Sequence, residues 1–84
     1  MLPEGLDMET YRQARSEVLE MCPYLNDAVE TGKLKEDDIR LFVFTYLEYT
    51  QTELAEVFRV TQQAIHKRLK KVRKEVVKNN IHIV

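Results

Sequence analysis

The chain has 84 residues, which is enough for one small domain and too few for a two-lobed enzyme cleft. Its hydrophobic fraction of 44% and charged fraction of 32% are typical of a folded globular protein. Only two glycines and two prolines are present, which argues against sandwiches and barrels and favours an all-α fold. The 13 basic and 14 acidic residues give a net charge of −1, which by itself argues against a nucleic-acid-binding protein.

The charge is, however, distributed unevenly along the chain. Residues 1–58 carry 5 basic and 13 acidic side chains, for a net charge of −8. Residues 59–84 carry 8 basic side chains and a single acidic one, Glu75, for a net charge of +7. The near-neutral total therefore conceals a basic end on an acidic body.

The first 35 residues predict two helices of unassigned role. Helical spacing over residues 7–21, with Asp7 as N-cap and Pro23 as the stop, predicts a first amphipathic helix. Its inward-facing residues are Leu6, Tyr11, Ala14, Val18 and Met21 or Cys22. Residues 24–31 predict a short second helix, after which Gly32 stands where a left-handed C-cap residue belongs.

Residues 36–49 predict a buried central helix. Glu36, Asp37 and Asp38 supply the acidic first turn, and the apolar run continues through Tyr49. Its β-branched and aromatic residues would also suit a strand, but its length and acidic start favour a helix. We expect a cluster of aromatic residues to lie in the core: Phe42, Phe44, Tyr46, Tyr49 and Phe58.

Two further helices are predicted after residue 50. Thr50-Gln51-Thr52-Glu53 is a capping box that begins a helix over residues 51–58. After a break at Arg59-Val60, Thr61 caps a long helix that runs to about Lys78. The buried positions of this helix are Ile65, Leu69, Val72 and Val76. The tail, residues 79–84, is predicted to be either a very short strand or a frayed end.

A short helix, a very short turn and a longer helix are typical of a helix-turn-helix, here within residues 36–78. The small residue Ala55 lies where the helices cross, Val60 is expected to fill the turn, and Ile65 is expected to pack under Leu54. From about residue 38 to 74 the chain resembles region 4 of bacterial sigma factors and the related LuxR-type DNA-binding modules. The resemblance is carried by Tyr46-Leu47-Glu48, Thr52-Glu53-Leu54-Ala55-Glu56-Val57-Phe58, Val60-Thr61, Ile65 and Lys67-Arg68-Leu69.

Two features depart from that family. Arg59 stands where the family usually has glycine, and an arginine in a left-handed conformation costs about 1 kcal/mol. The first 35 residues match no part of a sigma factor. The resemblance thus implies a DNA-binding module and not a complete sigma factor.

The face of the long helix opposite its buried positions consists of Gln, His and Lys side chains. Cations displace the counterions of duplex DNA, and amides pair with adenine edges in the major groove. The candidate base contacts are Gln62, Gln63, His66, Lys67 and Lys70. The candidate phosphate contacts are Thr50, Gln51, Arg59, Thr61, Arg68, Lys71, Arg73 and Lys74.

The favoured function is sequence-specific binding of double-stranded DNA by a small transcriptional regulator, with helix 61–78 in the major groove. Because one module reads few base pairs, a homodimer on two half-sites is expected. The alternative is a protein-interaction module that binds RNA polymerase or another transcription protein. Two further alternatives are that the basic face is only solvated, and that it binds acidic protein or anionic lipid.

No catalytic, cofactor or metal site is expected. The chain offers no nucleophile–base pair, no phosphate-binding loop and no spaced set of metal ligands, because Cys22, His66 and His82 stand alone. Cys22 is expected to be a packing residue. The chain also has neither a signal-peptide pattern nor an apolar run of about 20 residues, so no membrane association and a cytoplasmic, nucleoid-associated location are expected.

Overall fold

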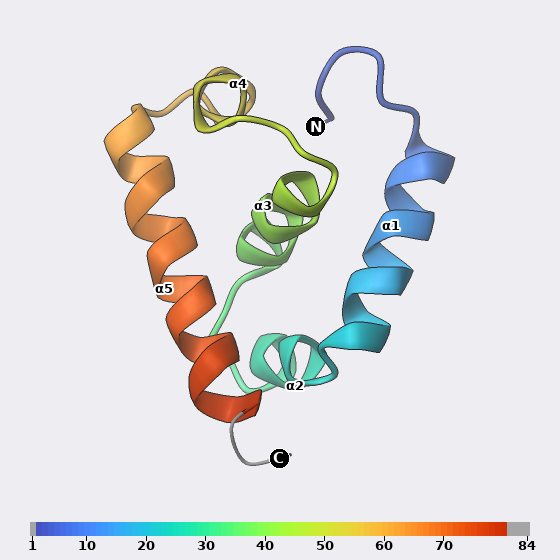
Figure 1. Ribbon diagram of the computed structural model, residues 1–84, viewed down its shortest axis with the longest axis vertical. Helices are drawn as coiled ribbons and strands as arrows, with labels where there is room; N and C mark the ends of the chain where they lie inside the picture. The colour runs from blue at the N-terminus through green and yellow to red at the C-terminus, as the bar shows by residue number, and fades with distance from the viewer. Residues whose placement is uncertain (1, 81–84) are drawn as a thin grey trace.

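Five helices make up most of the computed structural model, which describes residues 2–80. They are α1 (Met8–Met21), α2 (Tyr24–Glu30), α3 (Glu36–Tyr46), α4 (Gln51–Phe58) and α5 (Gln62–Asn80). Helix α3 runs through the centre with α1 on one side and α5 on the other, while α2 and α4 close the two ends (Figure 1). Residues 2–80 contain no strand, which confirms the predicted all-α fold.

The start of α1 and the end of α2 follow from local features of the sequence. The carboxylate of Asp7 accepts a hydrogen bond from the backbone N–H of Thr10 over 2.7 Å, so Asp7 is the N-cap of α1. This bond lowers the pKa of Asp7 below its ordinary value of 3.8. Gly32 has a φ of 80° after α2, which confirms the predicted left-handed residue there.

The core is formed where α3 meets the other helices. Phe44 is fully buried, and its ring centroid lies 5.5 Å from that of Tyr11 and 6.0 Å from those of Tyr49 and Phe58. The helix α5 contributes the predicted buried residues Ile65, Leu69, Val72 and Val76. Cys22 is buried at the end of α1, as expected for a packing residue. These contacts fix α5 against the acidic half of the chain.

The end of α3 was predicted incorrectly. The helix ends at Tyr46 and not at Tyr49, because Glu48 adopts a left-handed conformation with a φ of 71°. The N–H of Glu48 donates to the carbonyl of Thr45 over 2.9 Å, and the N–H of Tyr49 donates to the carbonyl of Phe44 over 3.1 Å. This pair of bonds is a Schellman motif, which closes the helix without a glycine.

The position of Tyr46 also differs from the prediction. Its side chain is 44% exposed and does not belong to the core, whereas Phe42, Tyr49 and Phe58 pack against the core as expected. The Tyr46 hydroxyl donates a hydrogen bond of 3.0 Å to the Glu17 carboxylate. This bond raises the pKa of Tyr46 above its ordinary value of 10.0, since the nearby carboxylate disfavours a phenolate.

The last helix is slightly longer than predicted. It reaches Asn80 instead of about Lys78, so the first two residues of the expected tail are helical. The possible strand was assigned to the tail up to residue 84, and residues 81–84 lie outside the described part of the chain. Among the described residues, none of the helices combines the length and the apolar character that crossing a membrane requires.

Candidate nucleic-acid interface

The helix-turn-helix consists of α4, the three residues Arg59–Thr61, and α5. At the start of α4 the predicted capping box is present. The Thr50 hydroxyl accepts a hydrogen bond from the N–H of Glu53 over 3.2 Å, and the Glu53 carboxylate accepts one from the N–H of Thr50 over 2.8 Å. The second bond is the main reason that the pKa of Glu53 lies below its ordinary value of 4.5.

The turn is closed by backbone hydrogen bonds. Arg59 is left-handed, with φ 56° and ψ 47°, a conformation that glycine adopts more readily than arginine. The N–H of Arg59 donates to the carbonyl of Glu56, and the N–H of Val60 donates to that of Ala55 over 3.0 Å, which is again a Schellman motif. The side chain of Val60 does not fill the turn as expected, because 37% of it remains exposed. The turn is therefore held by the backbone.

Helix α5 begins with a side-chain cap. The Thr61 hydroxyl accepts a hydrogen bond from the N–H of Ala64 over 3.1 Å, as predicted for a capping residue. Helix α5 packs against α4, with Leu54 and Ile65 fully buried and Ala55 buried beside them. Because this side of α5 is fixed in the core, its opposite side faces solvent in a defined orientation.

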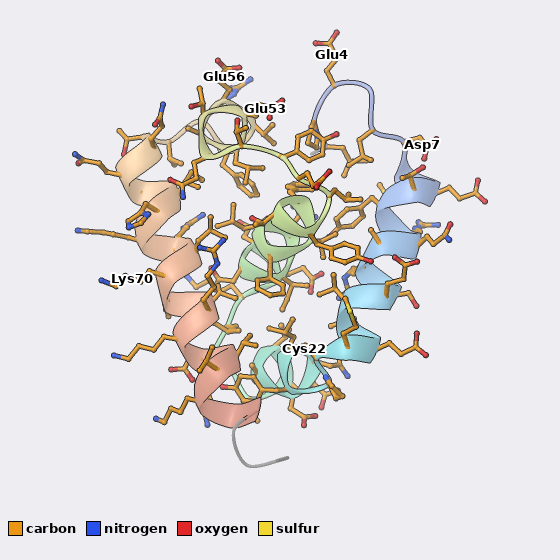
Figure 2. The ribbon with its side chains drawn as sticks, in the orientation of Figure 1. Glu4, Asp7, Cys22, Glu53, Glu56 and Lys70 are labelled. Carbon is orange, nitrogen blue, oxygen red and sulfur yellow. The ribbon has the colours of Figure 1, made fainter. Side chains whose placement is uncertain are left out.

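Five lysines form one continuous face on the outer side of α5. We call Lys67, Lys70, Lys71, Lys74 and Lys78 the lysine face; all five are exposed. They line a shallow depression of about 490 Å³ together with Glu75. In Figure 2, Lys70 projects from α5 away from the body of the protein, whereas the labelled Glu4 and Asp7 lie on the side of α1 and the labelled Glu53 and Glu56 lie on α4. The structure therefore separates the positive face from the N-terminal acids.

A second depression lies where the N-terminal ends of α4 and α5 meet. We call it the polar hollow; its volume is about 340 Å³, and it is lined by Gln51, Gln62, Gln63, His66 and Lys67. Gln51 comes from the first turn of α4 and the other four residues come from the first two turns of α5. Lys67 belongs to both depressions, so the amide-rich end and the lysine face are continuous.

Several predicted phosphate contacts are not part of these depressions. Arg59 lies beside the N-terminal segment, in a depression that it shares with Glu4 and Glu56. Arg73 lies on another side of α5, and Arg68 is half-buried. The structure thus brings together all five predicted base-contact residues, with Gln51, Lys71 and Lys74, but it places Arg59 and Arg73 elsewhere.

Two residues of this surface were missed in the sequence. Lys78 follows Lys74 and Lys71 by four and seven residues, a spacing that places it on the same side of the helix. This spacing was therefore sufficient to predict that Lys78 belongs to the lysine face. Glu75 also lines the depression, and its carboxylate accepts a hydrogen bond of 3.0 Å from the Tyr24 hydroxyl. It is the one acidic residue in residues 59–84.

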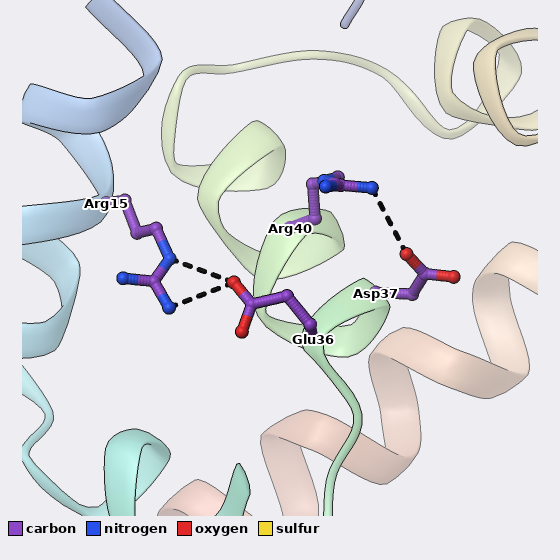
Figure 3. A network of polar contacts seen from close by, with 4 residues as sticks. All are labelled: Arg15, Glu36, Asp37 and Arg40. Atoms are coloured by element: carbon purple, nitrogen blue, oxygen red, sulfur yellow. Dashed lines mark hydrogen bonds and ion pairs between the residues drawn. The ribbon is translucent and has the colours of Figure 1, made fainter. Parts of the chain in front are cut away.

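The ion pairs between described residues include no residue of α5. Arg15 on α1 and Glu36 on α3 approach to 2.9 Å, and Arg40 and Asp37 approach to 3.3 Å on α3 (Figure 3). All four side chains are partly exposed, so each pair contributes little, roughly 0–1 kcal/mol, to stability. Both pairs join residues of the body, and neither neutralises a lysine of the lysine face.

An apolar groove lies on a different surface of the protein. Its volume is about 390 Å³, and its walls come from α1, α3 and α5. The lining residues are Val18, Met21, Cys22, Phe42, Thr45, Tyr46 and Arg73. Of the two residues of which one was expected to face inward, Cys22 is buried and Met21 is 62% exposed. The groove thus combines apolar side chains with one cation.

Within residues 2–80, no cluster of three or more His, Cys, Asp or Glu side chains has an arrangement that could hold a metal ion. Comparison of the chain with known protein families, with curated proteins and with solved structures finds no significant match. The resemblance to sigma factor region 4 therefore stays a prediction from the residue pattern.

Proposed function

We propose that this protein binds double-stranded DNA sequence-specifically and acts as a small transcriptional regulator. The observation that supports this proposal is the continuity of the polar hollow with the lysine face along α5. In the proposed complex, α5 lies in the major groove, its first turns contact base edges and the lysines contact phosphates. An α-helix with its side chains is about 10–12 Å wide, which matches a major groove of about 12 Å.

The charge distribution favours one orientation on DNA. A duplex carries about one negative charge per 1.7 Å of its axis, and lysines that neutralise phosphates release condensed counterions. The lysine face meets this requirement, whereas α1 lies across the molecule from α5 and carries Glu9, Glu17 and Glu20 (Figure 1). Repulsion between these acids and phosphates would disfavour approach from that side.

A homodimer is part of the proposal. A single helix-turn-helix reads few base pairs, and dimers of such modules bind half-sites about 34 Å apart, one helical turn of DNA. Selection of bound sequences from a random duplex pool should return a palindromic consensus with this spacing. A consensus without two-fold symmetry would contradict the dimer and leave DNA binding intact.

The proposed function is tested by removing two charges from the lysine face. Lys67→Ala with Lys70→Ala should weaken binding to duplex DNA on the order of tenfold at low salt. The melting temperature should be unchanged, because both side chains are exposed. Arg12→Ala with Lys33→Ala is the matched control, since it removes two exposed cations elsewhere. Equal affinities for the two double variants would overturn the proposal.

A second candidate function is favoured by the apolar groove. An exposed methionine and an exposed tyrosine beside Arg73 suit a partner helix that carries apolar and acidic side chains. RNA polymerase or another transcription protein would be that partner. Met21→Glu should then abolish co-purification with polymerase from nuclease-treated extract. Retention of polymerase by this variant, or its absence with the wild-type protein, would exclude the groove as the docking site.

A further inference from the structure

The polar hollow is chemically different from the lysine face. Three of its five lining residues are glutamines, one is His66 and one is Lys67, and none is acidic. The glutamines come from two helices, because Gln51 lies on α4 while Gln62 and Gln63 open α5. A surface that only neutralised phosphates would need cations, so a concentration of side-chain amides indicates hydrogen-bonded recognition of a particular chemical group.

The geometry of α5 distinguishes Gln63 from Gln62. At about 100° per residue, Gln63 lies about 160° around the helix from the buried Ile65, whereas Gln62 lies only about 60° from it. Gln63 is therefore at the centre of the outward face and Gln62 at its edge. Lys67, one turn further on, lies at about 200° and is a direct neighbour of Gln63 on that face.

We infer that Gln63 determines specificity by reading an adenine in the major groove of the bound duplex; this inference rests on the proposed function. A side-chain amide has one acceptor and one donor side by side. Adenine offers the complementary pair, the N6 amino group as donor and N7 as acceptor. Guanine presents two acceptors at these positions, N7 and O6. The carbonyl oxygen of the amide would then face O6, and no hydrogen bond can form between two acceptors.

Lys67 has a different role in this arrangement. Its ammonium group has three donors and no acceptor, so it cannot form the paired contact that adenine offers. One turn from Gln63, it meets either a flanking phosphate or the acceptors of a neighbouring guanine. The adenine preference should therefore depend on Gln63, and the overall affinity should depend on Lys67.

The test is a selection from a random duplex pool followed by substitution of single atoms in the selected site. The wild-type protein should enrich a site with an invariant adenine, and replacing that base by 7-deazaadenine should lower affinity roughly 5- to 100-fold. Gln63→Ala should bind both duplexes equally. Gln63→Glu should prefer cytosine at this position, because a carboxylate accepts from the N4 amino group. Gln13→Ala, an exposed glutamine on α1, is the matched control and should select the wild-type site.

The outcomes separate this inference from the proposed function. If the wild-type protein binds no duplex even at low salt, the proposed function fails and this inference fails with it. If lysine-dependent binding is present but Gln63→Ala selects the same base at every position as the wild-type protein, only the inference is overturned. Circular dichroism of each variant establishes that α5 is intact, so that a changed selection reports on Gln63 itself.

Discussion

The hydroxyl of Tyr24 donates a hydrogen bond of 3.0 Å to the carboxylate of Glu75. This bond joins α2 to the second half of α5, between residues 51 positions apart in sequence. Both side chains are half-buried, and Glu75 also borders the lysine face. The bond thus adds a polar contact to the apolar packing of Val72 and Val76, which also fixes the second half of α5 against the body.

Replacing Tyr24 by phenylalanine should destabilise the protein. The change removes the hydroxyl donor while the Glu75 carboxylate stays partly buried, which should lower the free energy of unfolding by about 1 kcal/mol. Urea unfolding measures this value. Tyr46→Phe is the matched control, because its hydrogen bond to Glu17 lies at the exposed surface and should contribute much less. Equal losses in the two variants would show that the Tyr24–Glu75 bond has no special structural role.

Neutralising Glu75 should strengthen DNA binding if the lysine face contacts phosphates. Glu75→Gln retains a hydrogen-bond acceptor for Tyr24 but removes the one negative charge that lines this depression. The affinity for duplex DNA should rise roughly two- to fivefold at low salt, and the difference should fade as salt is added. Fluorescence anisotropy with a labelled duplex measures the effect. A lower affinity with an unchanged fold would count against contact between this part of α5 and DNA.

The left-handed turn residues predict stabilising substitutions. Arg59 and Glu48 both have a positive φ without being glycine, and each closes a Schellman motif. Arg59→Gly should raise the free energy of unfolding by up to about 1 kcal/mol, because glycine adopts this conformation without a steric penalty. Arg59→Ala, which keeps a Cβ, should give no such gain. A gain of the same size from alanine would mean that the arginine side chain, and not the backbone conformation, is the source of the strain.

Two helix caps predict a loss of stability in acid. The pKa values of Asp7 and Glu53 are lowered in the folded protein because their carboxylates accept backbone hydrogen bonds. Their contribution is therefore present above the ordinary values of 3.8 and 4.5 and is lost as the pH falls through the lower folded-state values. Urea unfolding at about pH 6 and about pH 3 should show this decrease. Asp7→Asn with Glu53→Gln should show a smaller decrease, and an equal one would contradict the assignment.

The starts of α1, α4 and α5 could be predicted from sequence because each has a local side-chain cap. The caps at Asp7, Thr50 and Thr61 each use a residue three positions away, so a short window of sequence contains both partners. The end of α3 could not be predicted in this way. A glycine would have indicated a left-handed residue, but Glu48 occupies that position, and nothing in its side chain distinguishes it from a residue that continues the helix.

In the candidate site too, features that depend on local sequence could be predicted, and features that depend on packing between distant segments could not. The outward face of α5 follows from helical periodicity alone, and this is why most of the lysine face was predicted. The polar hollow depends on how α4 crosses α5, which brings Gln51 beside Gln62 and Gln63. Helical periodicity also places Arg73 off the lysine face, about 80° from the buried Ile65, whereas the position of Arg59 depends on a neighbouring segment, the N-terminal residues. Such relationships between distant segments leave no periodic signal in the sequence.

The measurement that tests DNA binding most directly is the salt dependence of the affinity for duplex DNA. The logarithm of the binding constant should fall linearly with the logarithm of salt concentration, with a slope of about −0.9 per neutralised phosphate. Removing Lys67 and Lys70 together should make this slope shallower by about 0.9 for each of the two that contacts a phosphate, and so by about 1.8 at most, whereas removing Arg12 and Lys33 should leave it unchanged. A slope near zero for the wild-type protein would contradict the proposal that the lysine face of α5 binds DNA.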